Sequence, residues 1–135
     1  MTSERWKDEP EKQDYPAARS YLSLLVDPSE AKKTAKTLAD DPDTARYKAK
    51  DILRAAGLPL LPLDDPEVAK DLAKVKAGTK LSPVLLVWGD PLWVVDGYHR
   101  VCASYHLDEN AEIPCRIVAR PRAITGRKRG RKGCP

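Results

Sequence analysis

The sequence predicts a small α/β domain of the α+β kind, in which a mixed sheet with its own helices follows a helical N-terminal segment. Three observations predict this class. Residues 15–57 carry helix-start signals at Pro16 and at Asp27-Pro28-Ser29. Residues 83–118 contain three short apolar runs of strand length, and a helix-like segment separates the last two. With 135 residues, the chain has the length of one domain.

Composition and cysteine usage exclude several classes of protein. Hydrophobic residues make up 41% and charged residues 33%, which is typical of a folded domain and not of a disordered chain. The longest apolar run, 83–88, is far shorter than the roughly 20 residues of a membrane span, so we expect no membrane partner. Three cysteines without a close pair, and a charged start that lacks a signal peptide, indicate a reduced, cytoplasmic protein.

Positive charge is concentrated at the C-terminus. The chain has 24 Lys or Arg and 20 Asp or Glu, and eight of the basic residues but no acid lie in 116–135, so residues 1–115 have a net charge of −4. We expect residues 120–135 to form a flexible basic tail. Its densest part could bind nucleic-acid phosphates, without sequence preference, through Arg127, Lys128, Arg129, Arg131 and Lys132. The alternative is a solvated tail without a partner.

The first half of the chain is predicted to be helical after a charged leader. Residues 1–14 contain almost no apolar side chains, so we expect a disordered leader. Helices are expected over 16–25, 28–39 and about 44–56, with Gly57 ending the third. Their alanine- and leucine-rich faces would allow a homodimer.

Residues 58–119 are predicted to hold the sheet and to form one domain with 15–57. The proline-containing run 58–63 is expected to be a buried connector or an edge strand. A helix is expected to begin at Asp65, to end at Gly78 and to share one apolar face among Val68, Leu72 and Val75. Strands are expected at 83–88, 92–95 and 113–118, and a further helix at 98–107.

The turn between the second strand and the following helix has the features of an anion site. Asp96 ends a β-branched strand, Gly97 permits an abrupt turn, and the helix then begins at once. Its first backbone N–H groups therefore point outward beside His99 and Arg100, which favours phosphate because a guanidinium offers a bidentate fork. Asp96 could hold a magnesium ion or orient His99. The alternative is a surface turn, in which Asp96 caps the helix and Arg100 pairs with a nearby acid.

Residues 65–118 resemble the ParB/sulfiredoxin-like superfamily of ParB-like nuclease-type domains. The matching pieces are the helix 68–75, the strand 81–87, the Asp-Gly-x-His-Arg motif 96–100 and the Ile-Pro-x-Arg-Ile-Val strand 113–118. The resemblance implies that a nucleotide, either CTP, ATP or ADP, binds with Mg²⁺ near Asp96 and with its phosphates at Gly97, Tyr98, His99 and Arg100. Residues 1–60 have no counterpart in this resemblance.

Tyr98 separates this chain from each group of the superfamily. The ParB group has Gly-Glu-Arg-Arg and a following DNA-binding domain, so ParB function in DNA segregation is not expected here. Sulfiredoxins carry their nucleophilic cysteine where this chain has Tyr98. A third group, which includes a free-serine kinase, has Asp-Gly-His-His-Arg, and this chain matches that motif except at Tyr98.

A kinase of that group would need a carboxylate that accepts the proton of the acceptor hydroxyl. The candidates are Asp64, Asp65 and Glu67, which stand at the start of the predicted helix, together with Asp96 and His99 in the motif. The alternative for Asp65 is a helix cap.

Lysine, serine, histidine and cysteine residues near the motif are further candidates for ligand binding. Lys80 and Ser82 precede the first core strand and could reach a phosphate, although a solvated lysine and a turn serine account for them equally well. No zinc is expected, because His99 and His106 would lie about 10 Å apart along the helix. Cys102 and Cys115 are expected to be small buried core residues.

Two classes of function follow from these observations. The first is a nucleotide-binding module that associates with DNA through its basic tail. The second is an enzyme, either a small-molecule phosphotransferase or a nuclease or nucleotide hydrolase, that uses the same phosphate site. A third alternative is a partner-binding domain that keeps the turn and has lost the ligand.

Overall fold

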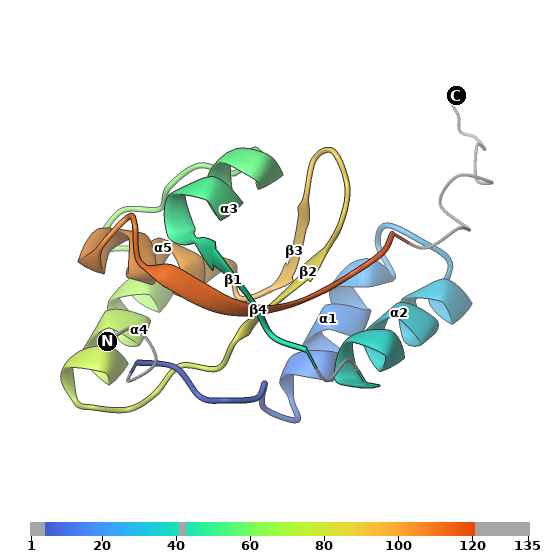
Figure 1. Ribbon diagram of the computed structural model, residues 1–135, viewed down its shortest axis with the longest axis horizontal. Coiled ribbons are helices and arrows are strands. Elements are labelled where there is room, and N and C mark those ends of the chain that lie inside the picture. Colours follow the sequence, from blue (N-terminus) through green and yellow to red (C-terminus); the bar gives the residue numbers. More distant parts are fainter. Residues whose placement is uncertain (1–4, 41–42, 121–135) are drawn as a thin grey trace.

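The computed structural model describes residues 5–40 and 43–120, which form an α+β fold of five helices and one four-stranded sheet (Figure 1). The helices are α1 (Asp14–Leu22), α2 (Pro28–Asp40), α3 (Ala49–Ala56), α4 (Pro66–Lys76) and α5 (Tyr98–Leu107). The strands are β1 (Ala45–Lys48), β2 (Val84–Val87), β3 (Trp93–Asp96) and β4 (Glu112–Val118). The predicted fold class is confirmed. No helix within these ranges is long and apolar enough to cross a membrane.

The strands follow the order β1-β4-β2-β3 in the sheet. β2 and β3 form an antiparallel hairpin, whereas β4 runs parallel to β2 and antiparallel to β1. A parallel pair needs a connection that returns across the sheet, and α5 lies within that connection. The start of α5 is therefore fixed at one end of β3, where the Asp96-Gly97 turn lies.

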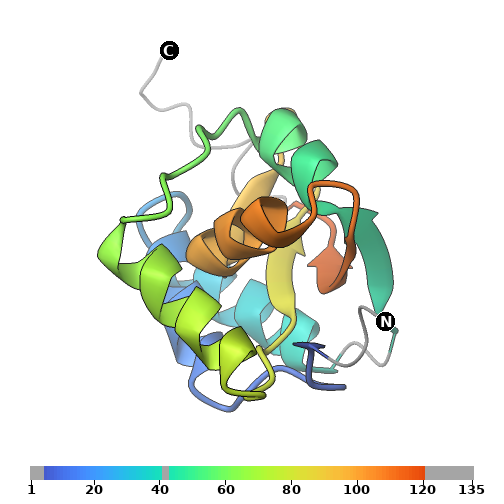
Figure 2. The same ribbon diagram turned by 90° about the vertical axis from the view of Figure 1, so that its left-hand side faces the viewer.

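Helices cover both faces of the sheet (Figures 1 and 2). Val84 and Leu86 of β2 belong to a buried cluster with residues of α3, α4 and α5. Leu85 and Val87 alternate with them along the strand and belong to a second cluster with residues of α1 and α2. Because β2 is buried on both faces, its sequence is apolar throughout rather than alternating.

The packing of α4 against α5 positions the candidate site. Val68 is fully buried, and Leu72 and Val75 pack against the same cluster, so the apolar face predicted from their spacing is the packed face of α4. Figure 2 shows α4 and α5 side by side in front of the sheet. The polar residues that flank this apolar face of α4 consequently lie close to the start of α5.

The prediction of a helix over 44–56 is wrong for its first part. Residues 45–48 form β1, which pairs with β4 so that Ala45 lies opposite Cys115 and Lys48 opposite Glu112. The helix α3 begins only at Ala49. Pairing with the sheet overrides local propensity here, and the edge position leaves Arg46, Tyr47 and Lys48 exposed, which hides the apolar alternation of a strand.

The prediction of a disordered leader is wrong for residues 5–14. Trp6 is 3% exposed and forms a parallel bridge with Leu81, because the Lys7 N–H donates to the Leu81 carbonyl at 2.7 Å and the Leu81 N–H donates to the Arg5 carbonyl at 2.8 Å. Asp14 is the first residue of α1. A single buried indole holds this charged segment against the domain, while its charged neighbours stay at the surface.

Candidate functional site

The turn that joins β3 to α5 leaves the beginning of α5 without a cap. Gly97 has φ +109°, and a Cβ atom there would lie 2.5 Å from Cγ1 of Val84, so only glycine fits. No side chain caps this helix, and the Val101 N–H donating to the Gly97 carbonyl at 3.0 Å starts its hydrogen bonds. The N–H groups of residues 98–100 therefore have no intrahelical acceptor, which gives this end of α5 a positive potential.

A polar cavity of about 190 Å³ lies between α4 and the start of α5. Every residue that lines it except Gly97 is ionisable: Glu67, Lys70, Asp71 and Lys74 from α4, and Asp96, His99 and Arg100 from the motif. On α4 the two acids are four residues apart and so are the two lysines, so each pair forms a row along the helix. The structure thus brings the predicted motif together with a charged face of α4.

Arg100 is held at the edge of this cavity. Its Nη2 donates to Oδ2 of Asp96 at 2.9 Å and to the carbonyl of Pro83 at 3.3 Å. Its Nε is buried and has no hydrogen-bond partner among the described residues. The guanidinium is therefore fixed in place with an N–H group still unused.

Asp96 carries a carboxyl group that is poorly solvated and close to a second one. Burial, with a smaller contribution from the neighbouring Asp14, raises the pKa of Asp96 to about 6, although Arg100 lowers it. Asp14 is 5% exposed, and its Oδ2 accepts a hydrogen bond from the Glu11 N–H at 2.9 Å. Asp96 therefore titrates near neutral pH at the edge of the cavity.

Sequence reasoning missed Asp14, Lys70, Asp71 and Lys74. Asp14 lies 82 residues before Asp96 in the chain, and only the packing of α1 on β3 brings the two together. The residues of α4 were missed because no local pattern indicates which helix lies beside α5. The regular spacing of acids and lysines on α4 was visible but is equally typical of a solvated helix face.

Two predicted site residues, Tyr98 and Asp65, have structural roles. Tyr98 donates its hydroxyl hydrogen to the carbonyl of Pro59 at 2.6 Å and does not line the cavity. Asp65 caps α4, since its Oδ2 accepts hydrogen bonds from the N–H groups of Glu67 and Val68 at 3.1 and 3.0 Å. It also lies 4.0 Å from Nε2 of His99. The alternative of a helix cap is confirmed for Asp65, while Glu67 lines the cavity.

The other predicted residues lie apart from the cavity. Lys80 is exposed and Ser82 is buried, and neither lines it. Cys102 and Cys115 are buried free thiols, as expected for core residues. The expected nucleic-acid contacts of the tail fall outside the described residues and stay a prediction: Arg127, Lys128, Arg129, Arg131 and Lys132.

The arrangement around Asp96 does not favour a magnesium ion there. Oδ2 of Asp96 already accepts a hydrogen bond from Arg100, and a guanidinium at 2.9 Å competes with a cation for the same oxygen. Within residues 5–40 and 43–120, no group of three His, Cys, Asp or Glu side chains could hold a metal ion.

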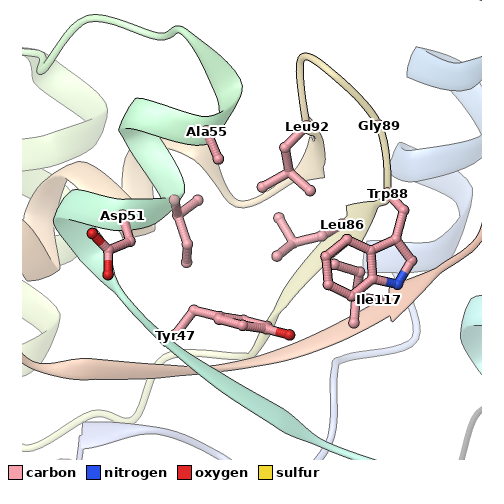
Figure 3. A pocket seen from close by; sticks show the side chains of 9 residues that line it. Tyr47, Asp51, Ala55, Leu86, Trp88, Gly89, Leu92 and Ile117 are labelled. Carbon is pink, nitrogen blue, oxygen red and sulfur yellow. The ribbon is translucent and has the colours of Figure 1, made fainter.

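A second cavity, of about 180 Å³, differs in chemistry from the first (Figure 3). It lies between β1, α3 and the β2–β3 hairpin, and aliphatic side chains form most of its wall. The rings of Tyr47 and Trp88 meet edge to face, with centroids 6.3 Å apart. The carboxylate of Asp51, its one acidic lining group, points away from the aliphatic centre (Figure 3). No Lys, Arg or His side chain lines this cavity, so it does not favour a phosphate.

The chain has no match among known proteins: no family model, no curated protein and no solved structure is similar to it. The resemblance to the ParB/sulfiredoxin-like superfamily therefore rests on the motif residues alone and stays a prediction.

Proposed function

We propose that the chain binds a nucleotide through its phosphates, in the cavity between α4 and the start of α5. One observation carries the proposal: the uncapped beginning of α5, Arg100, His99 and the two lysines of α4 all face one cavity. Backbone N–H groups at a helix start and a guanidinium fork are the donors that phosphate oxygens prefer. The motif resemblance implies the same site for phosphates.

The acids in the cavity do not prevent an anion from binding. Burial raises the pKa of Asp71 as well as that of Asp96, so both groups lose negative charge more readily than exposed carboxylates do. The hydrogen bonds of Arg100 to Asp96 and Pro83 both use Nη2, and a guanidinium has five N–H donors, so Arg100 can still donate to a phosphate oxygen in the cavity that it lines.

Thermal unfolding with added ligands tests this proposal. The ligands are CTP, ATP, ADP, GTP and inorganic phosphate, each with and without Mg²⁺. A ligand at 100 times its dissociation constant stabilises the folded state by about 2.7 kcal/mol, which raises the midpoint by several degrees. We expect such a shift with at least one nucleotide. Its absence with every ligand would contradict the proposal and leave a partner-binding domain as the alternative.

Variants locate the site. We expect Arg100→Ala to abolish the shift, and the double variant Lys70→Ala/Lys74→Ala, which changes only exposed side chains, to reduce it. The control is Arg54→Ala, because Arg54 is a highly exposed arginine on α3 outside the cavity. An equal loss in Arg54→Ala would show that the shift comes from the overall charge and not from this site.

Asp96 supports phosphoryl transfer or nucleotide hydrolysis as a second candidate function. A carboxyl group with a pKa of about 6 is largely ionised at pH 7.5 and can accept a proton from a hydroxyl or a water molecule beside a bound phosphate. An assay of nucleotide breakdown, with and without small hydroxyl acceptors, tests this function. Asp96→Asn should abolish turnover without weakening nucleotide binding. If the unaltered chain leaves the nucleotide unbroken, this second function is excluded.

A further inference from the structure

We propose that the cavity between α4 and α5 recognises a phosphorylated polyol, namely the sugar and phosphate of its ligand, and does not read the base. This inference rests on the proposed function, because it places the phosphate at the start of α5. It adds a ligand class and a residue that distinguishes that class from inorganic phosphate.

The lining of the cavity has no large apolar surface on which a base could stack. Seven of its eight residues are ionisable and the eighth is Gly97, so no Trp or Tyr ring lines it, and its one aromatic ring is the imidazole of His99. Tyr98, the other aromatic residue of the motif, is turned away by its hydrogen bond to Pro59. This lining favours a ligand that presents polar groups to it.

The size of the cavity indicates the same class. Its volume of about 190 Å³ is below the roughly 300–1,000 Å³ of cavities that enclose a whole drug-sized ligand. A phosphate and a sugar are small enough to lie within it, and the base of a nucleotide would then extend into solvent.

Asp71 provides the acceptor for a sugar hydroxyl. It is 8% exposed and lines the cavity, yet the described residues give it no hydrogen-bond donor and only one ion-pair partner, Lys74 at 4.0 Å. Its oxygens are not among the buried unpaired atoms of the described residues, so they reach the cavity and can accept a hydrogen bond from a ligand hydroxyl. Glu67 lies one turn earlier on α4 and lines the same side, where it can accept from a second hydroxyl.

The other carboxylates of this region are already satisfied. Oδ2 of Asp65 accepts two backbone N–H groups, and Oδ2 of Asp96 accepts from Arg100. The phosphate would therefore lie at the start of α5 beside Arg100, and the hydroxyls would extend along α4 toward Asp71.

Calorimetric titration of the full chain with four ligands tests the inference. These are inorganic phosphate, ribose 5-phosphate, AMP and CMP. We expect ribose 5-phosphate to bind at least about tenfold more tightly than inorganic phosphate, the factor that one or two added hydrogen bonds give. AMP and CMP should bind within a few-fold of ribose 5-phosphate and of each other.

The variant Asp71→Ala tests the residue, because alanine has no acceptor oxygen. We expect it to bring the affinity for ribose 5-phosphate down to about that for inorganic phosphate, while inorganic phosphate still binds and so reports an intact fold. The matched control is Asp51→Ala, since Asp51 is an exposed acid in the first turn of α3 and its loss also removes one negative charge. The control should keep the ratio of the two affinities.

Each contrary outcome contradicts a different part of the proposal. If ribose 5-phosphate binds no better than inorganic phosphate, recognition of the polyol is wrong and the proposed phosphate site stands. If AMP and CMP differ from each other by more than about tenfold, the base is read and the inference is wrong. An unchanged ratio in Asp71→Ala excludes Asp71 as the acceptor. If none of the four ligands binds, the proposed function itself is wrong.

Discussion

At the scale of single residues, the candidate site depends on a glycine that no other residue can replace. Gly97 combines φ +109° with a close approach to Val84, so a side chain there is excluded both by the backbone conformation and by space. Gly78 also has a positive φ, of +84°, but a Cβ atom there would have nothing within 4 Å. Substitution of Gly78 therefore measures the free-energy cost of backbone strain alone, whereas substitution of Gly97 adds the cost of a steric clash.

We therefore expect Gly97→Ala to destabilise the fold by several kcal/mol and Gly78→Ala by about 1 kcal/mol, since only the first adds a steric clash to the strain. Urea denaturation of both variants measures the difference. Equal losses of unfolding free energy would contradict the close contact between residues 97 and 84.

Asp96 gives the stability a dependence on pH. Its pKa is about 6 in the folded protein against 3.8 for an ordinary aspartate, so between these values the folded state binds a proton that the unfolded state does not. The contribution of this group to stability is therefore fully present below about pH 4 and is lost as the pH rises through 6.

We expect the unfolding free energy of the unaltered chain, relative to that of Asp96→Asn, to fall by on the order of 2 kcal/mol from pH 4.5 to 7.5. Denaturant titrations of both proteins at each pH measure it, and the acids that do not interact with Asp96 cancel in the comparison. A difference that stays constant over this range would contradict a raised pKa for Asp96.

At the scale of elements, the segment before α1 is part of the domain. We expect Trp6→Ala to cost about 3–5 kcal/mol of unfolding free energy, because it removes a buried indole from the core cluster that also contains Leu81. The control is Trp88→Ala, since the side chain of Trp88 is 50% exposed and should contribute much less. If Trp6→Ala were as mild as Trp88→Ala, the leader would be dispensable, as its composition suggests.

Local signals predicted the elements that depend on local chemistry. Neighbouring residues alone indicate the cap at Asp65, the apolar face of Val68, Leu72 and Val75, and the helix that begins directly after Gly97. Long-range contacts decide the rest. β1 is a strand because β4 lies beside it, Trp6 is buried because Leu81 is near, and Asp14 meets Asp96 only through the packing of α1 on β3.

The candidate site divides in the same way. The motif at residues 96–100 is contiguous and could be predicted, and Glu67 at the start of α4 was among the candidates, but the other residues of α4 that complete the cavity could not be predicted. Their place depends on how α4 packs beside α5, which no residue of α4 encodes by itself.

At the scale of the whole molecule, the cavity and the basic tail belong to different parts of the sequence. All residues that line the cavity lie between Glu67 and Arg100, whereas the five tail residues expected to contact nucleic acid lie beyond Arg120. The guanidinium of Arg120 stacks on Trp93 at 3.9 Å and donates to the carbonyl of Pro91 at 2.8 Å, which fixes the end of the described chain against the hairpin.

A chain ending at Arg120 should therefore keep its unfolding free energy and its nucleotide binding. If the tail contacts nucleic acid, the same truncation should remove that binding and its dependence on salt, because each phosphate contact contributes about 0.7–0.9 to the slope of log affinity against log salt. Filter binding and calorimetry on the two chains measure both effects. Loss of nucleotide binding on truncation would contradict a cavity formed by α4 and α5 alone.

Backbone amide shifts test the phosphate site most directly. In a ¹H–¹⁵N NMR titration with inorganic phosphate and then with CTP and ATP, we expect saturable shifts of the Tyr98, His99 and Arg100 amides, with smaller ones along Lys70–Lys74. The amide shifts of Tyr47 and Trp88 should stay unchanged, because no Lys, Arg or His side chain lines their cavity. Shifts that are absent at the start of α5, or that saturate only around Tyr47 and Trp88, would contradict a phosphate site at this turn.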